Sequence, residues 1–290
     1  MRKLPDPPRI DALIRWAAAE FGASPTPMID ARALAKAAIG LDDAALIADG
    51  ARTIGAEALA RFVSMVARRA EGEPVAHIVG QREFWSLDLE VAPGILVPRA
   101  DSETLIEAVI KRRGRHEVLK IIDLGCGSGA LLCALLSEFP NARGIGVDIN
   151  PDAVAVTSRN ISRLGFSTRA RAEEGDWFGG VERAFDIVIA NPPYIRTTDR
   201  GSLPREVRDY ESPLALFAGA DGLDSYRSIF SSAPAHIAAD GLLALEFGER
   251  QAGQVNEIAT AAFPKARIAV ENDLAGRPRA LVIDLRPPAH

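Results

Sequence analysis

Apolar residues recur at helical spacing from about residue 9 to residue 73 of this 290-residue chain, as at Leu13 and Ile14, and this region is rich in alanine. Between residues 74 and 100, prolines and glycines interrupt alternating apolar positions, which predicts a β-hairpin linker. In residues 101–290, short apolar runs of strand length alternate with helical segments. That alternation is typical of a parallel sheet with helices on both faces.

The last two predicted strands cover residues 267–270 and 280–285. The loop of residues 271–279 has no room for a crossover helix, so these strands should be antiparallel. Together with the earlier apolar runs, they predict an α/β fold with a seven-stranded sheet. A small helical bundle and a β-hairpin linker should precede that sheet.

A glycine-rich turn lies between the apolar run 117–123 and the helical segment 130–136. It reads Leu-Gly-Cys-Gly-Ser-Gly over residues 124–129, and glycine lets the backbone turn tightly and approach a ligand closely. Asp148 ends the next predicted strand at about 20 residues beyond the turn, the usual spacing for ribose recognition. These features predict a nucleotide-type cofactor site in which Asp148 accepts hydrogen bonds from both ribose hydroxyls.

The tetrapeptide Asn191-Pro192-Pro193-Tyr194 directly follows the apolar run 185–190. The prolines fix φ and cannot extend a sheet ladder, so they hold the Asn191 side-chain carbonyl and a backbone carbonyl at one rigid corner. Two such acceptors can hold an NH2 group, and the Tyr194 ring offers a flat surface for a planar amide or base. The tetrapeptide therefore predicts an active-site clamp rather than a simple stiff loop.

The glycine turn alone does not separate a dinucleotide site from an S-adenosylmethionine site, because both use this pattern. The clamp separates them: hydride transfer has no need of an amide-holding corner, whereas methyl transfer to an NH2 nitrogen requires one. Trp177, in the stretch 174–178, either packs on an adenine ring or belongs to the core. The sequence leaves both interpretations of Trp177 open.

With these motifs, the chain resembles the bacterial release-factor glutamine methyltransferases of the HemK/PrmC type over nearly its whole length. Other amino-methyltransferases share only the turn and the clamp, so the remaining similar stretches make the resemblance specific. These stretches are residues 80–85, 96–103, 214–216, 219–227, 245–251 and 273–277. The chain departs from the usual family pattern at Ala100, Ser102 and Cys126, where Pro, Thr and Thr are more common.

The resemblance implies a Rossmann-like methyltransferase sheet and S-adenosyl-L-methionine as the cofactor. The implied cofactor-binding residues are Gly125, Cys126, Gly127, Ser128, Gly129, Asp148, Trp177 and Asn191. The implied substrate-binding residues are Asn191, Pro192, Pro193 and Tyr194, and those expected to take part in catalysis are Asn191, Pro192 and Tyr194. The substrate would be the side-chain amide, N(5), of the glutamine in the Gly-Gly-Gln motif of peptide chain release factors.

A clamp alone cannot distinguish one exposed glutamine from thousands of others. We therefore expect residues 1–73 to be a domain that recognises the folded protein substrate, joined through the linker 74–100 to a methyltransferase domain, residues 101–290. Asp101 and Glu103 are acids near the clamp. We expect them to orient this segment or the cofactor, because an amide nitrogen becomes strongly acidic once methylated and needs no base beforehand.

The composition narrows the remaining classes of function. The chain is 48% hydrophobic and 25% charged, with a net charge of −5, and this acidic balance argues against stable nucleic-acid binding. Two cysteines, Cys126 and Cys133, cannot form a metal-ligand set, and their place in a buried βα unit argues against a disulfide. No signal segment or membrane-length apolar run is present. We expect a cytoplasmic monomer without metal or membrane association.

Two other functions are compatible with parts of the sequence. A methyltransferase acting on an exocyclic amine of a nucleic-acid base would use the same clamp. It would need a basic, aromatic recognition region, which the alanine-rich N-terminal residues do not supply. A non-enzymatic cofactor-binding or interaction protein would have no use for an intact clamp beside an intact glycine turn.

Overall fold

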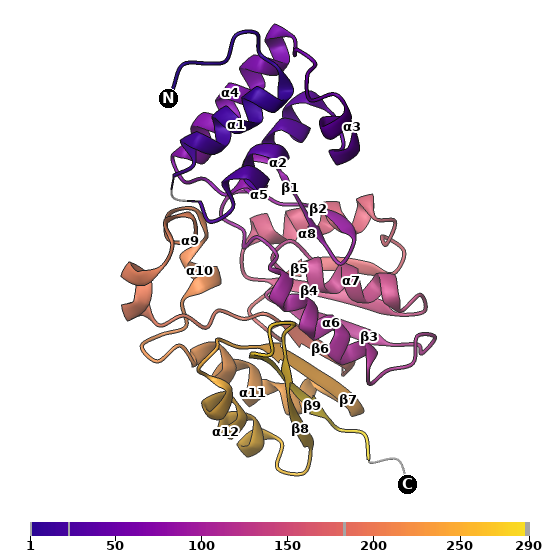
Figure 1. The fold of residues 1–290 in the computed structure, drawn as a ribbon. Coiled ribbons are helices and arrows are strands. Elements are labelled where there is room, and N and C mark those ends of the chain that lie inside the picture. Colours follow the sequence, from indigo (N-terminus) through magenta and orange to yellow (C-terminus); the bar gives the residue numbers. More distant parts are fainter. Residues whose placement is uncertain (1, 23, 182–183, 288–290) are drawn as a thin grey trace. The chain divides into compact units, whose positions relative to one another are not determined.

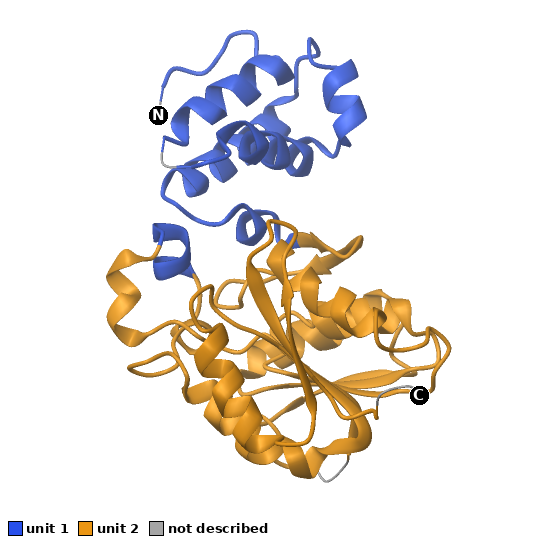
Figure 2. Cartoon of the chain, turned by 60° about the horizontal axis from the view of Figure 1, so that its bottom comes forward, with its two compact units in different colours: residues 1–81, 204–210 blue, residues 82–203, 211–290 orange. Residues whose placement is uncertain are grey.

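The computed structural model describes residues 2–22, 24–181 and 184–287. The chain forms two compact units, which Figure 2 shows in different colours. One is a helical unit of residues 1–81 and 204–210, and the other is a larger unit of residues 82–203 and 211–290.

The helical unit confirms the expected N-terminal bundle. Its helices are α1 (Ile10–Glu20), α2 (Pro27–Ile39), α3 (Asp43–Ala48), α4 (Ala56–Ala70) and α5 (Val75–Val79) (Figure 1). Local residues set the ends of α2, which begins at Pro27 and stops where Gly40 takes a left-handed φ of 75°. The apolar helix faces meet in one core around Leu13, Leu34 and Phe62.

A further short helix, α9 (Arg205–Tyr210), belongs to the helical unit although it lies far along the sequence. Arg69 of α4 is buried, and its guanidinium pairs with Asp30 at 2.8 Å and with Glu206 of α9 at 3.0 Å. Removing either carboxylate would leave a buried charge with less compensation, so this ion pair holds α9 to the bundle. The hydrophobic pattern did not predict that α9 belongs to the helical unit, because six residues are too few to show helical periodicity.

Strands β1 (Gln81–Phe84) and β2 (Leu87–Glu90) pair into a two-stranded sheet. The two turn residues between them have φ values of 52° and 57°, as a type I′ hairpin turn requires. Phe84 and Leu89 are buried in a core of the larger unit. The hairpin therefore contributes apolar side chains to that core.

The larger unit contains a seven-stranded sheet, which confirms the predicted fold class. Its strands are β3 (Lys120–Leu124), β4 (Arg143–Asp148), β5 (Ala170–Glu174), β6 (Phe185–Ala190), β7 (Ile237–Glu246), β8 (Arg267–Asn272) and β9 (Pro278–Asp284). They lie in the order β5-β4-β3-β6-β7-β9-β8. Strand β9 is antiparallel to β7 and β8, as the short C-terminal loop predicted, and the other pairs are parallel.

Helices cover both faces of the sheet (Figure 1). Helices α6 (Glu103–Ile110), α7 (Ala130–Glu138) and α8 (Pro151–Arg163) pack on one face, and α11 (Asp224–His236) and α12 (Ala252–Ala262) pack on the other. The connections contain the short helical segments η1 (Ala100–Ser102), η2 (Thr197–Ser202) and α10 (Pro213–Leu216). Within the described ranges, no helix has the length and apolar character needed to cross a bilayer.

The strand order reverses direction between β3 and β6. The chain enters the sheet at β3, continues outward through β4 and β5, and then returns to β6 on the other side of β3. Strands β3 and β6 are parallel neighbours, and Leu124 pairs with Ala190 at their ends. Ligands of open α/β sheets bind in the crevice beyond the strand ends at such a reversal. The glycine turn and the clamp, which directly follow these two residues, are thereby brought to this crevice.

Candidate active site

The glycine turn folds against the end of β4. The backbone amides of Gly125 and Cys126 both donate to the carbonyl of Val147, at 2.8 and 3.0 Å. Gly129 is the N-cap of α7, with a φ of 78°, and a Cβ at this position would lie 2.8 Å from the Thr157 side chain. Both the backbone conformation and the close approach to α8 therefore require glycine at this position.

Two backbone amides fix the carboxylate of Asp148, the last residue of β4. The amide of Gly127 donates to Oδ2 and the amide of Asn150 donates to Oδ1, each at 2.9 Å. The pKa of Asp148 is raised above its usual value, because burial outweighs the opposite effect of these two hydrogen bonds. Each carboxylate oxygen still has a lone pair for another donor, and acceptance from two ribose hydroxyls stays a prediction.

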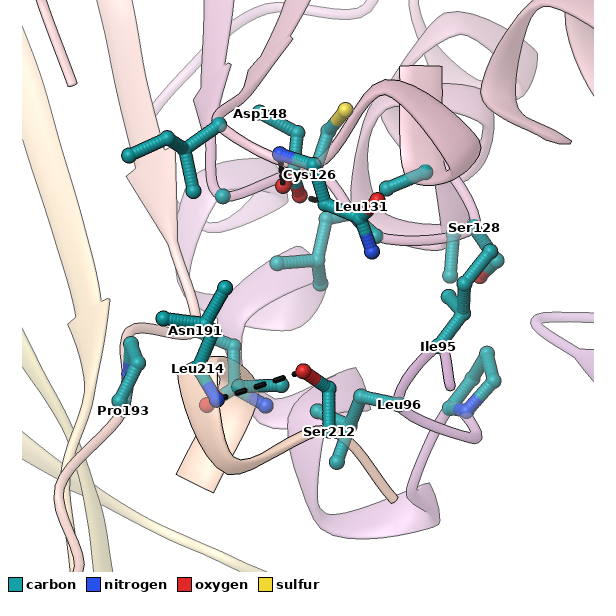
Figure 3. A pocket seen from close by; sticks show the side chains of 18 of the residues that line it. Ile95, Leu96, Cys126, Ser128, Leu131, Asp148, Asn191, Pro193, Ser212 and Leu214 are labelled. Atoms are coloured by element: carbon teal, nitrogen blue, oxygen red, sulfur yellow. Dashed lines mark hydrogen bonds between the residues drawn. The ribbon is translucent and has the colours of Figure 1, made fainter. Parts of the chain in front are cut away.

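A cavity of about 990 Å³, including its open mouth, adjoins the turn, and Figure 3 shows side chains around it. The structure brings most of the predicted site residues together there. The predicted residues that line the cavity are Gly125, Cys126, Gly127, Ser128, Asp148, Trp177, Asn191 and Pro193. In the described part of the chain, Gly129, Pro192 and Tyr194 are not among the lining residues.

Trp177 takes part in both the cavity wall and the core. Its ring lies 3.6 Å from the place where a Cβ of Gly125 would be, so a side chain at this glycine would narrow the space beside the ring. The indole is half-buried and packs against the apolar cluster between the sheet and α11. Adenine binding by Trp177 stays a prediction, since the ring is placed to serve either purpose.

The clamp side of the cavity is built from side chains. Asn191 follows β6, and its Nδ2 donates to Ser102 Oγ at 3.1 Å. Ser102 Oγ donates in turn to Glu246 Oε2 at 2.5 Å. Glu246 ends β7, the parallel neighbour of β6. Three segments that are distant in the sequence therefore meet behind the predicted clamp.

Tyr194, the last residue of the tetrapeptide, contacts the ends of other segments. Its hydroxyl donates to the other carboxylate oxygen of Glu246, Oε1, at 3.4 Å, and its ring lies close to the backbone of Gly248. Burial and the nearby Glu246 carboxylate raise the pKa of Tyr194, so the hydroxyl stays protonated and can act as this donor. The expected contact between this ring and a planar amide stays a prediction.

The two acids near the clamp hold segments of backbone. Asp101 Oδ2 pairs with the Arg279 guanidinium at 3.1 Å, and Glu103 Oε1 accepts from the backbone amide of Trp85 at 3.0 Å. These contacts agree with an orienting role for both residues. Among the residues that the structure describes, no group of three or more His, Cys, Asp or Glu side chains could hold a metal ion.

Sequence reasoning missed the parts played by Ser102 and Glu246. A signal for Glu246 is present, because it is an acidic residue that ends an apolar strand, as Asp148 does. Ser102 carries no comparable signal, since a single serine before a helix is ordinary. The apolar part of the wall includes Ile95 and Leu96 from a loop and Leu214 from the short helix α10, and neither segment is long enough to show a periodic pattern (Figure 3).

The described residues fit S-adenosylmethionine. Two backbone amides orient the Asp148 carboxylate, glycines leave the adjoining backbone open, and an aromatic ring is part of the wall. A carboxylate in this position is the usual partner of a ribose. The amide side chain of Asn191 follows β6 and lines the same cavity. Fold and site together define a Rossmann-like methyltransferase.

Comparison with known proteins shows the family within this class to which the chain is similar. Residues 12–80 match the model of the PrmC N-terminal domain, and residues 100–203 match that of the methyltransferase small domain. A release factor glutamine methyltransferase from Rhodospirillum rubrum is 40% identical over 272 residues, which cover 91% of this chain and 82% of the relative. Another from Cereibacter sphaeroides is 40% identical over 90% of this chain and 91% of the relative.

A solved methyltransferase from Pyrococcus furiosus shares the fold, with a TM-score of 0.51 and 16% identity over 76% of this chain and 98% of that chain. The chain belongs to the release factor glutamine methyltransferase family. Membership confirms the resemblance seen in the sequence, the enzyme class and the cofactor. The roles of individual residues stay predictions.

Proposed function

We propose that this enzyme transfers a methyl group from S-adenosylmethionine to the side-chain amide nitrogen of the glutamine in the Gly-Gly-Gln motif of peptide chain release factors. The observation that carries the proposal is the common cavity that Asp148 and Asn191 line from the ends of strands β4 and β6. The relatives from R. rubrum and C. sphaeroides, named release factor glutamine methyltransferases, support the substrate class.

A glutamine amide nitrogen is a poor nucleophile because its lone pair is delocalised into the carbonyl. When bound, S-adenosylmethionine supplies a methyl group on a positively charged sulfur. The side-chain oxygen of Asn191 and the backbone carbonyl of Pro192 would each accept one N–H of the substrate amide. Holding the nitrogen in this way reduces the entropic cost of the reaction, and both carbonyl dipoles favour the positive charge that develops on nitrogen.

The chain needs no general base before methyl transfer. Once the nitrogen carries the methyl group and a positive charge, it is strongly acidic and can lose its proton to water. Asp101 and Glu103 are already engaged with Arg279 and with the backbone of Trp85. Their contacts support a mechanism in which this enzyme orients the amide and leaves proton removal to solvent.

The test is incubation of the full-length chain with labelled S-adenosylmethionine and a purified release factor, followed by peptide mass spectrometry. We expect one methyl group on the glutamine of the Gly-Gly-Gln motif. A release factor with glutamate at that position is the matched control and should stay unlabelled. Label on ribosomal RNA or DNA, with none on the release factor, would contradict the proposal and favour methylation of a base amine.

We also propose that residues 1–73 recognise the folded part of the release factor and that the enzyme works as a monomer in the cytoplasm. A chain that begins at residue 82 should bind S-adenosylmethionine but methylate intact release factor poorly. A short Gly-Gly-Gln peptide serves as the control, since both chains should methylate it equally slowly if the active site is undamaged. Methylation of intact factor at the full-length rate by the truncated chain would contradict the recognition role.

A further inference from the structure

Ser102 connects two buried or half-buried groups at the clamp. Its hydroxyl accepts from Asn191 Nδ2 at 3.1 Å and donates to Glu246 Oε2 at 2.5 Å. Ser102 is 4% exposed and Glu246 is 1% exposed, so water does not compete readily for these hydrogen bonds. The contacts form one chain of hydrogen bonds that leads from a buried carboxylate to the cavity wall.

The chemistry of these groups sets the direction of the chain. An ionised carboxylate only accepts hydrogen bonds, and a serine hydroxyl has a single hydrogen to donate. When Ser102 gives that hydrogen to Glu246, it has only lone pairs left for Asn191. Asn191 must therefore turn its NH2 group toward Ser102, which leaves its carbonyl oxygen for the other side.

Hydrogen-bond donors and a cation face the Glu246 carboxylate and favour its ionised form, but burial outweighs them and the pKa of Glu246 is raised overall. The Tyr194 hydroxyl donates to Oε1, and the Arg279 guanidinium lies nearby. Burial raises the pKa of Glu246, while the hydrogen bond from Ser102 and the charge of Arg279 lower it. The Tyr226 hydroxyl donates to the backbone carbonyl of Glu246 at 3.0 Å and so holds this end of β7 in place.

We propose that Glu246 and Ser102 are positioning residues that keep the carbonyl oxygen of Asn191 turned toward the substrate amide. The inference rests on the proposed function, because the orientation matters only if an NH2 group is the target. The oxygen and nitrogen of an asparagine amide are nearly equal in size, so packing alone does not select one orientation. A reversed Asn191 would set an NH2 group against the NH2 group of the substrate, and the clamp would lose an acceptor.

Kinetics of three serine variants test this inference. Ser102→Ala should lower kcat for a Gly-Gly-Gln peptide by roughly tenfold to a hundredfold, less than loss of the clamp group itself, with unchanged affinity for S-adenosylmethionine. Ser102→Thr keeps the hydroxyl and should restore kcat. Ser225→Ala removes a hydroxyl of similar burial in α11, 7% exposed, and should have no effect on kcat. Wild-type kcat in Ser102→Ala would overturn the inference.

A spectroscopic measurement tests the orientation without catalysis. In protein with 15N-labelled asparagine, the Asn191 side-chain resonances can be assigned by their loss in Asn191→Asp. We expect one amide proton to be protected from exchange with water in the wild type and in Ser102→Thr, and exposed in Ser102→Ala. If both side-chain amide protons of Asn191 exchange rapidly in the wild type, the inference is wrong. This result does not depend on whether Ser102→Ala folds. Failure of the wild type to methylate glutamine would contradict the proposed function alone, because the exchange measurement would still decide the orientation.

Discussion

Backbone amides orient the polar group of the cavity beside β3 and β4, whereas side chains orient the polar group beside β6 and β7. On the first side, the glycine turn folds against β4, and amides of Gly127 and Asn150 orient the carboxylate of Asp148. On the second side, Asn191 depends on Ser102 and Glu246, which come from other segments. We call these the cofactor half and the clamp half of the cavity.

The two halves of the cavity should respond differently to substitution. In the cofactor half, the amides that orient Asp148 belong to the backbone and remain when a side chain changes. In the clamp half, each hydrogen bond uses a particular side-chain atom, and one truncation disturbs the next member of the chain. We therefore expect substitutions in the cofactor half to change affinity and those in the clamp half to change rate.

The largest effect should come from Asn191→Ala. Loss of one preorganised polar contact to a group that gains charge should reduce turnover by roughly 10² to 10³, with a modest fall in cofactor affinity. Single-turnover rates with a Gly-Gly-Gln peptide measure this effect, and Asn256→Ala, at an exposed position of α12, is the matched control. Near-full turnover by Asn191→Ala would leave the tetrapeptide as a stiff loop. Asn191→Asp is a sharper variant, because it keeps the shape but adds a negative charge beside both reactants.

Asp148→Ala should have the next largest effect, and on affinity instead of rate. Loss of charge-assisted hydrogen bonds to a ribose should weaken cofactor binding by about 1.5 to 3 kcal/mol. Calorimetry with S-adenosylmethionine measures the change, and turnover at saturating cofactor should stay close to that of the wild type. Asp152→Ala removes an exposed carboxylate from the first turn of α8 and should bind normally. Unchanged affinity in Asp148→Ala would remove this residue from the cofactor half.

Trp177→Ala should weaken cofactor binding less, by about 1 kcal/mol, or roughly fivefold, because the half-buried ring supplies one stacking surface. Trp177→Phe retains an aromatic ring at the same positive φ and should recover most of the affinity. Titration calorimetry separates these variants. If Trp177→Ala is unfolded, the main role of this tryptophan is packing in the core and not adenine binding.

A smaller effect concerns the stability of the cofactor half. Asp123 of β3 is buried, and its Oδ2 accepts from the backbone amide of Leu132 in α7 at 3.2 Å. Burial raises the pKa of Asp123 to about 7, well above the value of an exposed aspartate. The folded protein therefore binds the proton more tightly than the unfolded chain, and the stability that protonation provides is lost as the pH rises through the folded pKa.

Between pH 6.5 and pH 8, this group should lower the free energy of unfolding by about 1 kcal/mol. Chemical denaturation at both pH values measures the change. Asp123→Asn should lack this contribution, while Asp240→Asn, at an exposed position, should behave like the wild type. Equal pH dependence in the wild type and Asp123→Asn would show that this carboxyl group does not titrate in the window.

The same division explains what the sequence could predict. Strand, glycine turn and Asp148 lie within one short stretch, so spacing and periodicity were enough to predict the cofactor half and the sheet around it. Asn191 was predicted because its prolines give a local signal. Its support by Ser102 and Glu246 was not, since a hydrogen bond between distant segments leaves no periodic pattern. The inclusion of α9 in the helical unit escaped prediction for the same reason, because it depends on the ion pair between Arg69 and Glu206.

The most direct test of the account is a high-resolution crystal structure of the enzyme with S-adenosylhomocysteine and a Gly-Gly-Gln peptide. The account predicts that the glutamine amide nitrogen lies about 3 Å from Asn191 Oδ1, with Asn191 Nδ2 on Ser102 and the ribose on Asp148. A glutamine amide that lies outside the clamp, or that faces the nitrogen of Asn191, would contradict it.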